Sequence, residues 1–183
     1  MSGLGHNGGP TLEGGTSWRR FVWTKARADL MPKLPLEVAR RRVRRAAELG
    51  IDYKSYAGIR AATGRDIIAL IFSDNALRLL REGQLPDEVS AKLDALRCVD
   101  GLGMAHPPLT PAAMAACHEV IRRAARAPGL SQSWRETRQS VLDLKQDLPG
   151  DGVVVIGATS LERDWSEAGR LAGFLHADRF LPR

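Results

Sequence analysis

The sequence GDGVVVIGATSLERDW, residues 150–165, contains the clearest strand in the chain and determines the fold class. Its central run of three valines and an isoleucine, with glycines on both sides, predicts a β-strand, because β-branched side chains pack well on a pleated surface. A single strand would leave its backbone N–H and C=O groups unpaired. The best partner is the apolar run IIALIF, which ends in polar turn residues. The sequence therefore predicts a small sheet with strands near 67–72 and 153–157.

Helices are predicted between these two strands. Thr110 followed by Pro111 is a typical helix start, and Ser133 with Glu136 matches the capping-box pattern. Strands that are joined by helices run parallel, with right-handed crossovers, so we expect an α/β fold that is mainly helical with a small parallel sheet. A third strand is needed for independent stability, but no other stretch identifies it. The predicted helices span residues 87–98, 111–126 and 134–147.

Two glycine-containing stretches complete this part of the chain. Residues 101–108, GLGMAHPP, are interpreted as a loop that is stopped by the prolines. The last helix is expected to contain Gly169 and Gly173, which are four residues apart. Such a flat stripe would let another helix or strand approach closely, and it is a candidate contact in a homodimer.

The positive charge of the chain is concentrated toward its N-terminus. The net charge is +6, and residues 19–65 contain 13 lysines and arginines against four acids, whereas the remainder is net negative. Such an excess of cations is typical of a surface that binds a polyanion. Residues 1–17 contain six glycines and no apolar periodicity, which indicates a disordered arm. We therefore predict an arm over 1–17, a basic helical region over 18–65 and a helical α/β core over 66–183.

The basic region contains two predicted helices that are separated by a short corner. Pro35 and Glu37 suit the start of the first helix, Gly50 suits its end, and Asp52 suits the cap of the second. The expected inner stripe of the first helix is Leu36, Ala39, Val43 and Ala46. Its expected outer face carries Arg40, Arg41, Arg44 and Arg45.

The corner follows a known pattern of small and apolar residues. Ala46 lies four positions before Gly50, which is followed directly by Ile51 and later by Ile59. This pattern resembles the helix-turn-helix superfamily over residues 43–62. The resemblance implies that arginines of the first helix neutralise phosphates, while the second helix lies near the bases of a major groove. The residues that would bind nucleic acid are Arg40, Arg41, Arg44, Arg45, Lys54, Ser55 and Arg60.

A second resemblance concerns residues 5–10, GHNGGP, which are similar to a short N-terminal signature of uncharacterised bacterial and prophage proteins. It implies no activity. Together the two resemblances and the charge favour a nucleic-acid-binding protein, DNA-binding in particular, of bacterial or prophage type. An acidic protein surface is the other expected partner of the basic helical region. The alternative function is a non-enzymatic adaptor that docks its partner through residues 1–17 or the last helix. The third hypothesis is a small α/β enzyme with an anion site at the strand ends.

The enzyme reading rests on polar residues at the ends of the two predicted strands, since ligands of open parallel sheets bind there. Thr159 and Glu162 match a capping box, so the first amides of the following helix would face an anion. A serine nucleophile would need a general base, for which the candidates are His106, His118 and His176. No catalytic residue, metal site or cofactor follows from the sequence. The candidate anion or ligand site consists of Ser73, Asp74, Asn75, Thr159 and Ser160.

Targeting signals are not evident in the sequence. The longest apolar runs are far shorter than the roughly 18 residues of a membrane span, and the N-terminus has no apolar core of a secretion signal. We expect a soluble cytoplasmic protein without a membrane partner. In that compartment Cys98 and Cys117 would be reduced thiols.

Overall fold

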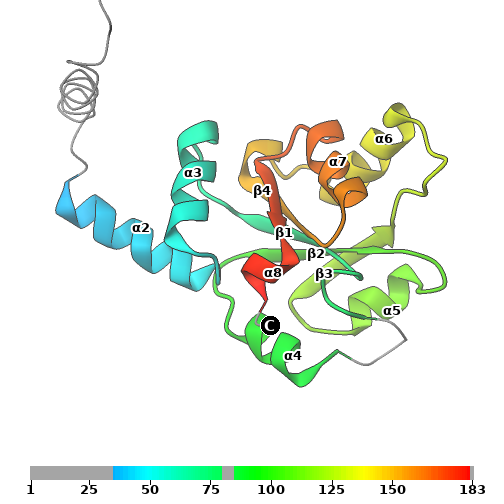
Figure 1. Ribbon diagram of the computed structural model, residues 1–183, viewed down its shortest axis with the longest axis horizontal. Coiled ribbons are helices and arrows are strands. Elements are labelled where there is room, and N and C mark those ends of the chain that lie inside the picture. The colour runs from blue at the N-terminus through cyan, green and yellow to red at the C-terminus, as the bar shows by residue number, and fades with distance from the viewer. Residues whose placement is uncertain (1–34, 80–84, 182–183) are drawn as a thin grey trace, which may run out of the picture. The chain divides into compact units, whose positions relative to one another are not determined.

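The computed structural model describes residues 35–79 and 85–181, in which seven α-helices and a five-stranded sheet are found (Figure 1). The helices are α2 Leu36–Glu48, α3 Tyr53–Thr63, α4 Asp87–Asp94, α5 Pro111–Ala116, α6 Trp134–Lys145, α7 Ser160–Ala168 and α8 Ala177–Phe180. The strands are β1 Ala69–Ser73, β2 Asp100–Ala105, β3 Ile121–Arg126, β4 Val153–Gly157 and β5 Gly173–His176. None of the helices in these ranges has the length and apolar character that a membrane span requires. The predicted arm, 1–17, and part of the predicted basic region, 18–65, lie outside the described residues.

The sheet is parallel throughout, with the strand order β3-β2-β1-β4-β5. β1 and β4 are neighbours, with Ala69 opposite Val153 and Phe72 opposite Ile156, which confirms the predicted pair of strands and the α/β fold class. From β1 the chain moves outward through β2 and β3, and it then returns to place β4 on the other side of β1. The direction of winding therefore reverses between β1 and β4. In open parallel sheets such a reversal creates a crevice at the carboxyl ends of the strands.

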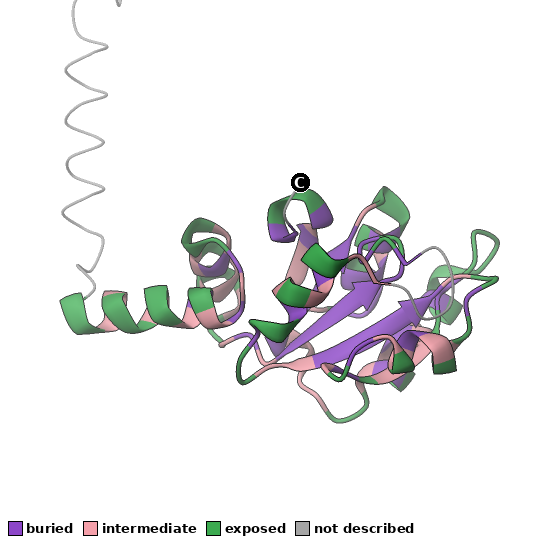
Figure 2. Ribbon diagram, turned by 90° about the horizontal axis from the view of Figure 1, so that it is seen from below, coloured by how far each residue is buried: buried purple, intermediate pink, exposed green. Residues whose placement is uncertain are grey.

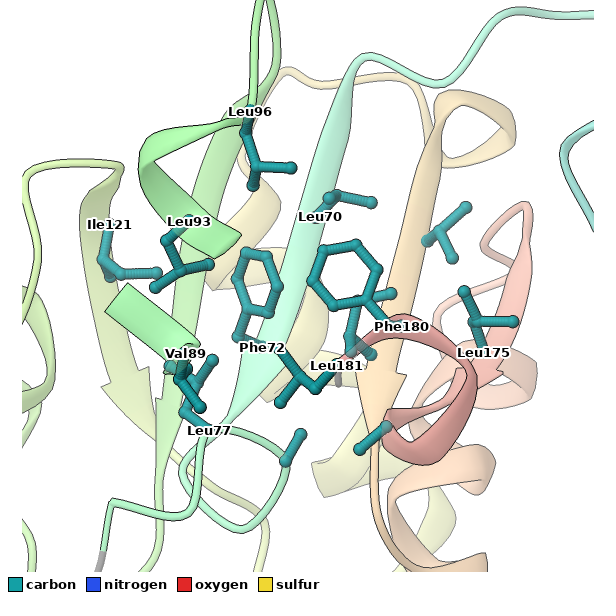
Figure 3. Packing of buried hydrophobic residues seen from close by; sticks show 14 of the residues in the cluster. Leu70, Phe72, Leu77, Val89, Leu93, Leu96, Ile121, Leu175, Phe180 and Leu181 are labelled. Atoms are coloured by element: carbon teal, nitrogen blue, oxygen red, sulfur yellow. The ribbon is translucent and has the colours of Figure 1, made fainter. Parts of the chain in front are cut away.

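Both faces of the sheet are covered, which explains why β1 and β4 are unbroken apolar runs. Figure 3 shows one face, where Val89 and Leu93 of α4 and Phe180 of α8 lie over Leu70 and Phe72. The rings of Phe72 and Phe180 are 5.6 Å apart. Strands β1, β2 and β4 are accordingly almost entirely buried (Figure 2). On the opposite face, α6 and α7 pack against the sheet. This second cluster includes Ala69, Ile71, Val141, Val153, Val155 and Trp165.

Strand β2 corrects the prediction of a loop over residues 101–108. Its sequence, DGLGMA, contains two glycines, which weaken a strand unless close packing requires them. A Cβ on Gly103 would lie 2.6 Å from Cγ of Met114 in α5, and a Cβ on Gly101 would overlap the backbone of Val120. β2 pairs with β1 in the interior of the sheet. A stretch that was interpreted as a connection is therefore part of the core.

Strand β3 corrects the prediction of one helix over residues 111–126. The helix α5 ends at Ala116, and residues 121–126, IRRAAR, form a strand. Only Ile121 in this strand is buried, because β3 lies at the edge of the sheet. Charged side chains are common on edge strands, where they discourage pairing with other chains. The predicted helices near 87–98 and 134–147 correspond to α4 and α6.

The last predicted helix is shorter than expected. α7 ends at Ala168, and Gly173 begins β5, so the two glycines do not form one helical stripe. A Cβ on Gly169 would lie 2.5 Å from Cγ1 of Val141 in α6. The close helix approach that was expected at Gly169 is thus confirmed, and it is a contact within the chain.

The predicted helical hairpin is present. Gly50 has φ +62, and Asp52 caps α3 by accepting a hydrogen bond of 2.9 Å from the backbone N of Ser55. The predicted inner stripe of α2 is wrong, because Leu36 and Val43 are 64% and 52% exposed. Ala46 is the one stripe residue that is buried, since only the C-terminal end of α2 reaches the core.

Candidate active site at the carboxyl ends of the strands

Asp74 and His106 meet at the carboxyl ends of two adjacent strands. The register of β1 and β2 places Ser73 opposite Met104, and the backbone N of Asp74 extends this ladder with a hydrogen bond of 3.1 Å to the O of Met104. His106 directly follows the last residue of β2. Its Nδ1 lies 2.6 Å from Oδ1 of Asp74, whose side chain is only 9% exposed.

This contact sets both the protonation and the orientation of the imidazole. The hydrogen bond with Asp74 is the main cause that raises the pKa of His106 above its ordinary value; burial opposes the rise, and the negative charges of Asp74 and Glu162 add to it. When Nδ1–H donates to the carboxylate, Nε2 of the neutral ring is the unprotonated nitrogen. No described residue forms a hydrogen bond with that Nε2. The ring can therefore accept a proton from a molecule beside it.

Glu162 of α7 joins the ends of β1 and β4 across the reversal in strand order. Its side chain is fully buried, and Oε1 accepts a hydrogen bond of 2.8 Å from Nδ2 of Asn75. Oε2 accepts hydrogen bonds of 2.5 and 3.1 Å from the backbone N of Ala158 and Thr159. A Cβ on Gly157 would lie 2.8 Å from Oε2 of Glu162, so glycine leaves room for the carboxylate.

The predicted capping box of α7 is confirmed, but it changes the interpretation of the anion site. Thr159 Oγ1 accepts a hydrogen bond from the N of Glu162, and Glu162 accepts from the N of Thr159 in return. The amide of Thr159, which was expected to face an external anion, is thus engaged by a carboxylate of the chain itself, as is the amide of Ala158. An internal anion already occupies this part of the helix N-terminus.

A cavity of about 580 Å³ opens beside His106. Trp165, which is 2% exposed, forms its inner wall and stacks on the imidazole with ring centroids 5.6 Å apart and an interplanar angle of 30°. Trp165 and Glu162 belong to the same short helix, α7. This helix therefore contacts the ring of His106 through Trp165 and the end of β1 through Glu162. The polar lining residues include Asn75, His106, Thr159 and Asp164, and the apolar ones include Leu130, Trp134, Leu161 and Trp165.

The predicted strand-end residues divide into two groups. Asn75 and Thr159 line the cavity, and Asp74 lies behind it in contact with His106. Ser73 is fully buried and its Oγ accepts a hydrogen bond of 2.9 Å from the N of Ala76, while Ser160 is exposed and outside the lining. Ser73 and Ser160 form no hydrogen bond with a histidine among the described residues.

The other two candidate bases have structural contacts elsewhere. Nε2 of His118 lies 3.3 Å from Oδ1 of Asp94. His176 caps α8, with Nδ1 accepting a hydrogen bond of 3.3 Å from the N of Asp178. His106 is therefore the histidine that the cavity contains.

The sequence predicted Arg45 on the solvent face of α2, but the structure places its side chain against other parts of the chain. Its side chain is 15% exposed, with Nε 3.0 Å from Oδ2 of Asp66 and Nη1 3.2 Å from Oε2 of Glu48. Nη2 donates hydrogen bonds of 2.8 and 3.0 Å to the backbone O of Ile67 and Cys98. The guanidinium holds the hairpin against the segments that enter β1 and β2.

Two other expected nucleic-acid contacts are also engaged within the chain. Ser55 Oγ donates to Oδ2 of Asp52 at 2.5 Å and accepts from Nη2 of Arg179 at 2.6 Å. Arg60 lies 3.5 Å from Oδ1 of Asp66. The start of α3 is therefore tied to α8, and its middle is tied to the loop before β1.

The remaining expected contacts are exposed. Arg41, Arg44 and Lys54 form no ion pair with any residue that the structure describes. Arg40 is also exposed. Arg40, Arg41 and Arg44 share one face of α2, because residues three or four apart are neighbours on a helix.

Comparisons with known proteins gave no match to a family model, to a curated protein or to a solved structure.

From the sequence, His106 was predicted only as one of three candidate bases, and no role in a site was predicted for the side chains of Glu162 and Trp165. His106 was assigned to a loop, although it follows the apolar stretch GLGMA as directly as Asp74 follows β1. Glu162 was recognised only as part of a capping box, and its contact with Asn75 depends on the pairing of β1 with β4. Trp165 is buried like a core residue, but it also lines the cavity.

Proposed function

We propose that the protein is an enzyme that binds a small organic molecule in the His106 cavity and transfers a proton to or from it through this imidazole. The observation that carries the proposal is the contact of 2.6 Å between Asp74 and His106 beside a cavity at the carboxyl ends of the strands. A carboxylate on Nδ1 fixes the tautomer in which Nε2 is the base, as in other acid–base sites of enzymes.

The surroundings of His106 support the same role. The stacked Trp165 restricts the ring to one plane, and Glu162 adds a second negative charge that favours the imidazolium once a proton has been accepted. Asn75 and Thr159 offer hydrogen-bonding groups on the cavity wall for orienting the bound molecule. The raised pKa makes His106 a stronger base than a free imidazole.

Hydrolysis of p-nitrophenyl acetate tests the base, because this activated ester reports on a reactive imidazole. We expect the rate to rise with pH through the pKa of His106 and to fall in His106→Asn by about a hundredfold, the lower range of general acid–base contributions. His176→Asn is the matched control, since asparagine also caps a helix and this histidine lies outside the cavity. A folded His106→Asn protein that hydrolyses the ester at the wild-type rate would refute the proposal.

A second candidate function is nucleic-acid binding by the exposed face of α2. It is favoured by Arg41 and Arg44, which are exposed and have no ion-pair partner in the described ranges. In a salt series with random duplex DNA, each lost phosphate contact should reduce the slope of log K against log salt by about 0.9. The double variant Arg41→Ala/Arg44→Ala should therefore have a flatter slope than the wild type. The control double variant Arg126→Ala/Arg135→Ala, which also removes two exposed arginines, should have the wild-type slope. Equal slopes in all three proteins would exclude this function.

A further inference from the structure

The ionisable side chains in and behind the cavity wall are acidic, apart from His106. No lysine or arginine is among its described lining residues, although the chain as a whole has a net charge of +6. Asp164 lines the cavity, is partly buried and forms no ion pair or hydrogen bond with any described residue. Asp74 and Glu162 lie immediately behind the lining and keep their carboxylates close to His106. An anionic ligand would meet one carboxylate on the cavity wall, with two more behind it.

We propose that the cavity takes an organic cation, that is, an ammonium, amidinium or guanidinium group attached to an apolar body. This inference rests on the proposed function in that it concerns the same cavity. The cationic group pairs with Asp164, the lining carboxylate that has no partner within the chain. A charge-assisted hydrogen bond in a partly enclosed site is stronger than one in water, which makes such a carboxylate an effective anchor.

The apolar body has a separate place to bind. Leu130, Trp134 and Leu161 are 85%, 54% and 50% exposed, and all three line the cavity. Exposed apolar side chains that gather in one cavity are typical of a ligand-binding site. The exposed ring of Trp134 can contact an aromatic or aliphatic body, and it attracts a cation over its face.

The arrangement also corrects the charge expected from the sequence. A capped helix N-terminus beside strand ends predicted an anion site, but Glu162 engages the amides of Ala158 and Thr159, which directly precede the helix. Asp164, in the following turn, is the lining carboxylate that selects the charge of the ligand. The fold therefore uses a typical position for phosphate binding to select the opposite charge.

Three ligands of one shape test the proposal: benzamidine, benzamide and benzoate, which are cationic, neutral and anionic. Binding to the full-length protein is measured by isothermal titration calorimetry at low ionic strength. We expect benzamidine to bind at least about tenfold more tightly than benzamide, which is a modest effect for a desolvated charge pair, and benzoate to bind most weakly. Asp164→Asn should reduce the affinity for benzamidine about tenfold and leave that for benzamide unchanged.

The control variant is Asp147→Asn, which removes an exposed carboxylate outside the cavity and makes the same change in net charge. Equal affinities for the three ligands, tighter binding of benzoate, absence of benzamidine binding at millimolar concentration, or equal effects of both variants would each overturn the inference. Because calorimetry requires no turnover, its outcome is independent of ester hydrolysis. A charge preference without His106-dependent hydrolysis would refute only the proton transfer.

Discussion

Asn75 and Glu162, which are 87 positions apart, form a partly buried hydrogen bond of 2.8 Å that joins the end of β1 to the helix after β4. Glu162→Ala would leave three donors without their acceptor: Nδ2 of Asn75 and the amides of Ala158 and Thr159. We expect the free energy of unfolding to fall by about 2–3 kcal/mol, the range for hydrogen bonds to a buried charged group. Urea denaturation followed by circular dichroism measures this change.

Glu167→Ala serves as the control for this prediction, because Glu167 is an exposed carboxylate in the same helix. Its loss should change the free energy of unfolding by less than about 0.5 kcal/mol. An equally small effect of Glu162→Ala would show that the bridge between the strand ends contributes nothing to stability.

Asp74→Asn should lower the pKa of His106. In the wild type the hydrogen bond from Asp74 is the main cause of the raised pKa, and asparagine removes the charge while keeping the shape of the side chain. NMR titration of the imidazole protons measures the midpoint directly. An unchanged midpoint for His106 would mean that Asp74 does not hold the imidazolium.

The same contact makes stability depend on pH. Because the pKa of His106 is higher in the folded state than in the unfolded chain, the contact stabilises the folded state fully below the unfolded pKa of about 6.5. This contribution is lost as the pH rises through the folded pKa. The difference in unfolding free energy between wild type and Asp74→Asn should accordingly be larger at acidic pH than at alkaline pH. A difference that grows with pH would contradict the assignment.

Strands β1 and β4 could be predicted from the sequence, whereas β2 and β3 could not. β1 and β4 are continuous apolar runs because helices cover them on both sides. β2 lacks that signal, since Gly101 and Gly103 make room for Val120 and Met114. The arginines of β3 are compatible with an edge strand but equally with a helix face. Without β2 the neighbour of Asp74 could not be identified.

The roles of the arginines in α2 depended on partners that are distant in sequence. Arg44 and Arg45 are adjacent, so they point about 100° apart on the helix. Only Arg45 meets Asp66 and the carbonyl oxygens of Ile67 and Cys98. Those segments come together through the pairing of β1 with β2, which the periodicity of α2 does not encode.

Arg45→Met should therefore destabilise the fold, while Arg44→Met should not. Methionine keeps the length of the side chain but removes the donors to Oδ2 of Asp66 and to the backbone carbonyls of Ile67 and Cys98. Because Asp66 is 38% exposed and keeps its contacts with Tyr56 and Arg60, we expect a loss of about 1.5–3 kcal/mol in the free energy of unfolding, the range for hydrogen bonds to charged groups. For the exposed Arg44 we expect a change within about 0.5 kcal/mol. Similar unfolding midpoints for both variants in urea would show that Arg45 is not the anchor of the hairpin.

The two cysteines should differ in reactivity. Burial raises the pKa of Cys117 to about 11, whereas Cys98 is exposed at a backbone position with φ +53. The thiolate is the reactive form, and at pH 8 about one thousandth of a thiol with this pKa is ionised. Iodoacetamide at pH 8 should therefore modify Cys98 well before Cys117, which mass spectrometry of timed samples can follow in Cys98→Ser and Cys117→Ser. In urea the two rates should converge, because unfolding removes the burial that suppresses ionisation of Cys117. Equal rates in the folded protein would mean that α5 exposes Cys117 and does not pack it against the core.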